Sequence, residues 1–134
     1  LDELTALRAI IATVAASVPQ LLTRRLHERI SKLLDGAGEA GAVDPIRLAQ
    51  EVATLADRAD VTEELVRLAS HVEQARSLLA AGGAAGRRLD FLVQEIGREL
   101  NTIGSKSAVA EISAAVVEAK AVLEKVREQV QNVE

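Results

Sequence analysis

An unbroken heptad pattern near the end of the sequence constrains the fold more than any other feature. Apolar residues recur there at alternating steps of three and four, the spacing of a helix face that packs along a partner helix. These residues are Val109, Ile112, Val116, Ala119, Leu123, Val126, Val130 and Val133. The pattern predicts one long final helix with Val116, Leu123 and Val130 buried, and it favours self-association of the chain.

The rest of the chain shows the same period, and no segment alternates as a β-strand does. Apolar stripes of helical spacing extend over residues 4–33, 48–55, 65–79 and 89–103. Pro19 interrupts the first stripe, so it either kinks one long helix or begins a second one. The sequence therefore predicts an all-α bundle of about five helices.

Turn residues mark the boundaries between these helices. Three glycines fall within 35–43 and three more within 81–86, which predicts two loops. Asp44 followed by Pro45 predicts an N-cap and a first helical residue. Residues 104–107 predict the end of one helix and the cap of the next.

Composition excludes several classes of protein. The 134 residues suit one domain and contain no cysteine, which excludes disulfides, thiol nucleophiles and cysteine zinc sites. Phe91 is the sole aromatic residue, which argues against modules that bind nucleic acid by stacking bases on exposed rings. Sixteen basic and 20 acidic residues give a net charge of −4, so nucleic-acid binding would need local patches or assembly. No stretch is apolar for long enough to span a membrane, and the absence of cysteine and of an export signal favours the cytoplasm.

Acidic residues form the first candidate site, since no phosphate-binding loop or zinc-protease motif is present. Glu95 and Glu99 lie four residues apart and share a helix face, and Glu111 and Glu118 share a face of the last helix. Carboxylates from two helices can hold a divalent cation, and oxygen ligands favour Mg²⁺ or Mn²⁺. The alternative is a solvated face on which Glu95 pairs with Arg98.

Basic residues form the second candidate site. Arg87, Arg88, Arg98 and Lys106 lie along one predicted helix, and a separate cluster contains Arg24, Arg25, Arg29 and Lys32. Arginine binds phosphate in a bidentate way and lysine adds a point charge. The alternative is again a solvated surface.

Histidine supplies the third candidate. His71 lies on the predicted third helix and His27 lies beside the second basic cluster. An imidazole can act as general acid or base near neutral pH. The alternative for each is a structural role.

The second half of the chain also carries distinctive motifs. Residues 86–106 read GRRLDFLVQEIGRELNTIGSK, and the chain ends on REQVQNVE. Shorter matches are RLHER at 25–29, LAQEV at 48–52, ADRADVTEEL at 56–65, and His71. Together these segments, which cover most of the chain, resemble the C-terminal region of the YicC family of bacterial, stress-associated endoribonucleases.

The resemblance implies a manganese-preferring (or magnesium-dependent) endoribonuclease that cleaves single-stranded RNA and assembles as a hexamer. It implies that residues 1–81 form a helical linker region and 82–134 the family's C-terminal domain. An N-terminal domain precedes them in a full member of the family. Whether the helical portion alone cleaves RNA stays open.

The resemblance also suggests roles for the candidate residues. The metal ion would polarise the scissile phosphate and activate either water or the 2′-hydroxyl as nucleophile. Its ligands would be Glu95 and Glu99, helped by Glu111 or Glu118. RNA phosphates would be held by Arg87, Arg88, Arg98 and Lys106. His71 would serve in acid–base chemistry.

Departures from the family pattern keep two alternatives open. Gly97 stands where the family usually has Asn, Leu100 where it has Ala, and Ile96 where it has Met. Gly97 costs the helix about 1 kcal/mol relative to Ala. One alternative is a helical scaffold that oligomerises through the heptad stripe without chemistry of its own. The other is an engineered bundle whose natural activity is gone.

Overall fold

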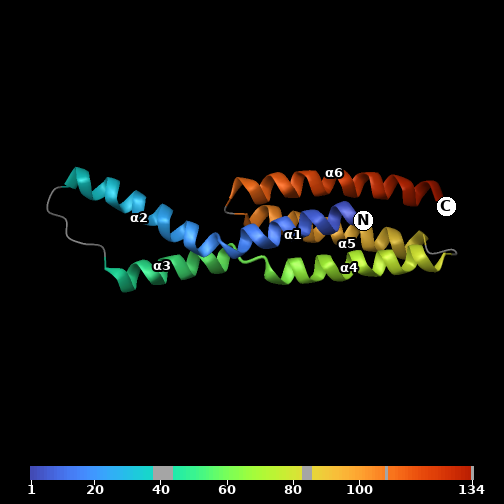
Figure 1. The fold of residues 1–134 in the computed structure, drawn as a ribbon, viewed down its shortest axis with the longest axis horizontal. Coiled ribbons are helices and arrows are strands. Elements are labelled where there is room, and N and C mark those ends of the chain that lie inside the picture. The colour runs from blue at the N-terminus through green and yellow to red at the C-terminus, as the bar shows by residue number, and fades with distance from the viewer. Residues whose placement is uncertain (38–43, 83–85, 108, 134) are drawn as a thin grey trace.

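The computed structural model describes residues 1–37, 44–82, 86–107 and 109–133. Within these residues the chain forms six helices and no strand, which confirms the all-α fold (Figure 1). The helices are α1 (Asp2–Ala16), α2 (Val18–Ala37), α3 (Pro45–Arg58), α4 (Thr62–Ala81), α5 (Gly86–Lys106) and α6 (Ala110–Val133). The two predicted glycine loops are shorter than expected, because α2 extends to Ala37, α4 ends at Ala81 and α5 already begins at Gly86. Residues 38–43 and 83–85 of these loops lie outside the described residues.

A break at Ser17 divides the first apolar stripe into two helices. The amide and the hydroxyl of Ser17 both donate to the Val14 carbonyl, at 3.1 and 2.8 Å. Pro19 then lies in the first turn of α2, where its missing N–H leaves no hydrogen bond unmade. The axes of α1 and α2 differ by 46°. Pro19 therefore begins a second helix, and this break brings the helices of the described chain to six.

The predicted cap of α3 is present, whereas the cap predicted before α6 is a turn at Ser107, since α6 begins only at Ala110. Asp44 accepts a hydrogen bond from the Ile46 amide at 3.0 Å, and Pro45 occupies the first position of α3. After α5 ends at Lys106, the hydroxyl of Ser107 accepts a hydrogen bond from the Val109 amide at 3.4 Å. Local sequence chemistry thus sets these boundaries.

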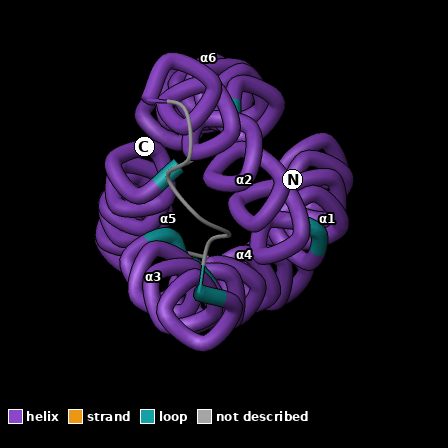
Figure 2. Tube along the Cα trace, turned by 90° about the vertical axis from the view of Figure 1, so that its left-hand side faces the viewer, coloured by secondary structure: helices purple, strands orange, loops and turns teal. Residues whose placement is uncertain are grey.

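Four helices form an antiparallel bundle, seen along its length in Figure 1 and end-on in Figure 2. Helix α5 packs against α4 and α6, and α1 completes the ring by packing against the same two helices. The most deeply buried side chains in the core are Leu4, Ile11, Leu68, Ile96, Leu100 and Ile103.

The heptad stripe of α6 is buried inside the chain. Val116, Leu123 and Val130 are buried as predicted, and α6 packs on α5 and α1. The partner that the stripe predicts is therefore the rest of the same bundle, and the stripe does not by itself require a second copy. In α4, by contrast, Leu79 is 51% exposed and Ala75 takes the core position of the predicted stripe.

Helices α2 and α3 form a hairpin that projects beyond one end of the bundle (Figure 1). Among the described residues of the hairpin, Val18 and Leu48 alone are buried. The basic residues Arg24, Arg25, Arg29 and Lys32 are exposed on α2. No single helix in the described ranges has the length and apolar composition to cross a membrane; α1 joined to residues 18–33 meets that test as a pair across its bend.

Candidate functional site

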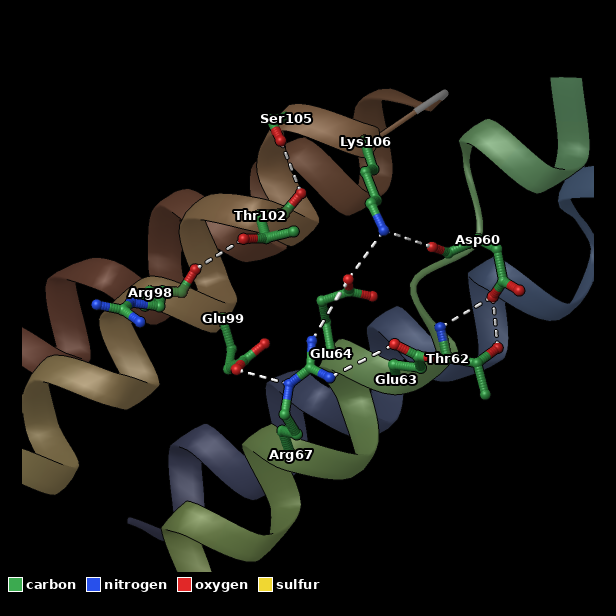
Figure 3. Close-up of polar contacts among 10 residues, drawn as sticks. All are labelled: Asp60, Thr62, Glu63, Glu64, Arg67, Arg98, Glu99, Thr102, Ser105 and Lys106. Atoms are coloured by element: carbon green, nitrogen blue, oxygen red, sulfur yellow. Dashed lines mark hydrogen bonds and ion pairs between the residues drawn. The ribbon is translucent and has the colours of Figure 1, made fainter.

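The interface between α4 and α5, here called the α4–α5 seam, gathers charged residues of both helices (Figure 3). Arg67 of α4 donates from Nε to Oε1 of Glu99 at 2.8 Å. Its other nitrogens lie 3.6 Å from Glu64 and 3.5 Å from Glu63. Glu99 and Glu64 are 5% and 4% exposed, so Arg67 neutralises two carboxylates that are almost wholly removed from water.

A second cation closes the seam at the end of α5. Nζ of Lys106 lies 2.8 Å from Oε1 of Glu64 and donates to the carbonyl of Asp60 at 3.3 Å. Burial opposes the charged form of Glu64, yet the hydrogen bond from Lys106 and the charges of Lys106 and Arg67 lower the pKa of this carboxyl below its usual value. The hydrogen bond to Glu64 in turn raises the pKa of Lys106. The pair is therefore ionised at neutral pH.

From the Arg67–Glu99 pair, the antiparallel register of the seam continues to His71 and Glu95, one turn further along each helix. His71 follows Arg67 by one turn of α4, and Glu95 precedes Glu99 by one turn of α5. His71 is half-buried, and its Nδ1 is fully buried without a hydrogen-bond partner among the described residues. The Glu95 side chain is 21% exposed. All three predicted catalytic residues, His71, Glu95 and Glu99, thus belong to one seam.

The four acids of the predicted metal site do not meet within the described chain. Glu95 and Glu99 face α4, whereas Glu111 and Glu118 are exposed on α6, beside rather than within its buried stripe. Glu99 is held by Arg67. In the described ranges no three His, Asp or Glu side chains come together in a group that could hold a metal ion.

The predicted RNA-binding residues differ in their surroundings. Arg87 and Arg88 are exposed at the start of α5. The Arg98 side chain is 74% exposed, lies 4.0 Å from Glu95 and points away from the Arg67 cluster (Figure 3). Lys106 is instead held by Glu64 and Asp60. Three of the four basic residues are therefore open to a ligand, and the fourth holds the seam together.

The sequence reasoning did not single out Arg67 or Glu64. The signal for Glu64 is its position: an acid falls within the three-and-four spacing that continues through Leu68, His71 and Ala75. A charged residue on an otherwise apolar stripe is buried and needs a partner. Arg67 is that partner. Its own position lies outside the apolar stripe and therefore gives no comparable signal in the sequence.

Comparison with known proteins identifies the family of this chain. A family model described as "Endoribonuclease YicC-like, C-terminal" matches residues 11–134. The chain is 47% identical over 124 residues to the "Probable endoribonuclease YicC" of Clostridioides difficile (strain 630), which covers 92% of this chain and 41% of that relative.

A second similar protein is the "Probable endoribonuclease YicC" of Haemophilus influenzae (strain ATCC 51907 / DSM 11121 / KW20 / Rd). It is 52% identical over 92 residues, which cover 69% of this chain and 32% of that relative. The chain therefore spans less than half the length of these curated relatives. It belongs to the YicC-like endoribonuclease family, whose C-terminal region it matches.

Proposed function

We propose that this chain is the C-terminal part of an endoribonuclease that cleaves single-stranded RNA along the α4–α5 seam. The relatives' names support an RNA substrate. The observation that carries the proposal is the buried Nδ1 of His71, one turn along α4 from Arg67, which has no hydrogen-bond partner among the described residues. A buried imidazole nitrogen without a partner costs stability, so such atoms are rare in folded proteins and concentrate where a function requires them.

An imidazole and a carboxylate across one seam suit acid–base cleavage of a phosphodiester. One group takes the proton of the attacking hydroxyl, from water or the 2′-position, as the new P–O bond forms. The other gives a proton to the leaving oxygen as the old P–O bond breaks. The exposed guanidinium of Arg98 lies beside Glu95, where it can stabilise charge on the phosphate.

A requirement for Mn²⁺ or Mg²⁺ is part of the proposal, although this chain does not assemble the predicted ligand set. When bound, such an ion would polarise the phosphate and lower the pKa of a bound water. Glu95 is the acid on the seam that could hold it, because Arg67 holds Glu99. Further ligands would come from another chain, from the longer protein, or from water and RNA.

Assembly and cellular location remain part of the same proposal. Hexamers are expected for the family, but the α6 stripe is already buried within one chain, so another surface must form the contacts between copies. Light scattering over a range of concentrations tests whether the chain is larger than its 14.2 kDa. We likewise propose a cytoplasmic protein active under stress.

A cleavage assay tests the proposed function. End-labelled single-stranded RNA and a duplex of the same sequence are incubated with the 134-residue chain and with a full-length relative, in chelator, Mn²⁺ or Mg²⁺. We expect metal-dependent cleavage of the single strand by the relative. If neither the single strand nor the duplex is cleaved under any of these conditions, the result contradicts the proposal and favours the helical scaffold.

A further inference from the structure

The aromatic side chain of Phe91 lies on the surface rather than in the core. It is 59% exposed, although the neighbouring Leu92 is buried. The chain has no other aromatic residue. A single exposed apolar side chain is common in folded proteins, so the role of this ring depends on the groups that surround it.

Phe91 lines a groove of about 680 Å³ between α4 and α5. This volume falls within the range of small-molecule sites and suits one nucleotide. Arg87 and Arg88 line the same groove from α5, and Ser70, Glu73 and Gln74 line it from α4. The groove thus combines a ring, two guanidinium groups and a polar edge.

Within the part of the chain that the structure describes, the two arginines of the groove have no anionic partner. Neither forms an ion pair with any residue of the described ranges, in contrast to Arg67, Arg76 and Arg127. Two adjacent guanidinium groups at the start of a helix also add their charge to the positive end of its dipole. This end of the groove therefore attracts an anion, and phosphate suits arginine best.

The opposite rim, on α4, suits a base better than a phosphate. The Glu73 carboxylate would repel a phosphate there. Gln74 donates to the Ser70 hydroxyl at 3.0 Å, which leaves its amide oxygen to accept and the hydroxyl proton to be donated. These are the groups that bind the edge of a nucleobase.

We propose that this groove binds one unpaired nucleotide of single-stranded RNA, with its base stacked on Phe91 and its phosphate held by Arg87 and Arg88. The inference rests on the proposed function and adds to it a site that positions the substrate. Phe91 and Glu95 are one turn apart on α5, so a strand anchored at Phe91 continues along the seam toward His71. Stacking also explains a preference for single strands, because a paired base cannot leave its duplex without cost.

A tryptophan at position 91 tests the stacking directly. The chain contains no Trp or Tyr, so Phe91→Trp would supply the only indole emission. We expect a ten-nucleotide oligoadenylate to quench this emission and an abasic strand of equal charge to leave it unchanged. Val117→Trp is the matched control, because Val117 is 68% exposed on α6, and its emission should not respond.

Binding affinity gives the second measurement. Phe91→Ala should weaken oligoadenylate binding between about 5- and 100-fold, the usual cost of losing one stacked base, and should leave the abasic strand unaffected. Arg87→Ala with Arg88→Ala should weaken both ligands and reduce the salt dependence by about one ion per lost phosphate contact. These exposed positions should tolerate substitution, and circular dichroism checks that the variants fold.

The outcomes separate this inference from the proposed function. Unchanged oligoadenylate affinity in Phe91→Ala, or no binding by the parent chain at about 50 mM salt, overturns the nucleotide site. A fall in molar mass of Phe91→Ala with RNA affinity unchanged would show that the ring contacts another protein copy, and also overturns it. RNA cleavage by the relative would still support the proposed function in each case. Binding that depends on Phe91 without any cleavage would support the site and contradict the proposed function.

Discussion

Nε of Arg67 and Oε1 of Glu99 lie 2.8 Å apart and join α4 to α5 by a charged hydrogen bond. Glu99 is 5% exposed, whereas the Arg67 side chain is 48% exposed. Removing the arginine would leave the Glu99 carboxylate buried without a cation. Removing one residue of the pair should therefore lower the free energy of unfolding more than replacing both by apolar residues.

We expect Arg67→Met to lower the free energy of unfolding, because the Glu99 carboxylate then stays buried without a cation, and by less than for a fully buried pair because half of Arg67 is in water. Urea unfolding measures this change. The double variant Arg67→Met with Glu99→Met should regain most of the loss, since no charge is then buried unpaired. Arg98→Met, at a 74% exposed side chain, is the control. An equal loss of stability in Arg67→Met and Arg98→Met would contradict the importance of the ion pair between Arg67 and Glu99.

The pair formed by Glu64 and Lys106 predicts a pH dependence of stability at both extremes. The pKa of Glu64 is below its ordinary value of 4.5, so its contribution is complete above that pH and is lost as the pH falls through the lowered value. The pKa of Lys106 is above 10.5, so its contribution is complete below that pH and is lost as the pH rises through the raised value.

Urea unfolding of the 134-residue chain as a function of pH checks this prediction. Glu64→Gln should flatten the acid side of the curve, and Lys106→Met should flatten the alkaline side. An acid limb of unchanged slope in Glu64→Gln would show that other carboxylates cause it.

The α4–α5 seam also predicts which substitutions abolish cleavage. In a full-length relative, the changes equivalent to His71→Gln and Glu95→Gln should each reduce the cleavage rate about 10²- to 10⁴-fold, because each removes one proton-transfer group. Both should fold normally. Glu51→Gln is a matched control on α3, where Glu51 is exposed. Full activity in the Glu95 variant would show that Glu95 has no catalytic role and only pairs with Arg98 on the helix surface.

The sequence predicted the helix faces better than it predicted their partners. The heptad spacing identified Val116, Leu123 and Val130 as buried, because period alone decides which residues share a face. The same rule placed Glu95 and Glu99 together. It could not show that this face meets α4 with Arg67, rather than Glu111 and Glu118 of α6, because the order of helices around a bundle depends on long-range packing. Phe91 illustrates the same limit, since composition counts aromatic residues without showing which are exposed.

Two glycines on α5 give a further test of packing against α6. A Cβ on Gly97 would lie 3.4 Å from Cδ2 of Leu123, an ordinary contact, and one on Gly104 would lie 3.3 Å from Cγ1 of Val116. Gly97→Ala should therefore raise the free energy of unfolding by about 0.5–1 kcal/mol through helix propensity. Gly104→Ala should gain less, because Val116 is 3% exposed and must shift. Thermal unfolding of both variants compares them, and a larger gain at Gly104 would contradict the close packing.

The hairpin of α2 and α3 divides the molecule into parts of unequal stability. Its described side chains bury little, while the bundle holds almost all of the core, so the two parts need not unfold together. We therefore expect the amide hydrogens of the hairpin to exchange with solvent through openings that leave the bundle folded. The position of the hairpin relative to the bundle can therefore vary at small cost in free energy, while the α4–α5 seam inside the bundle stays rigid.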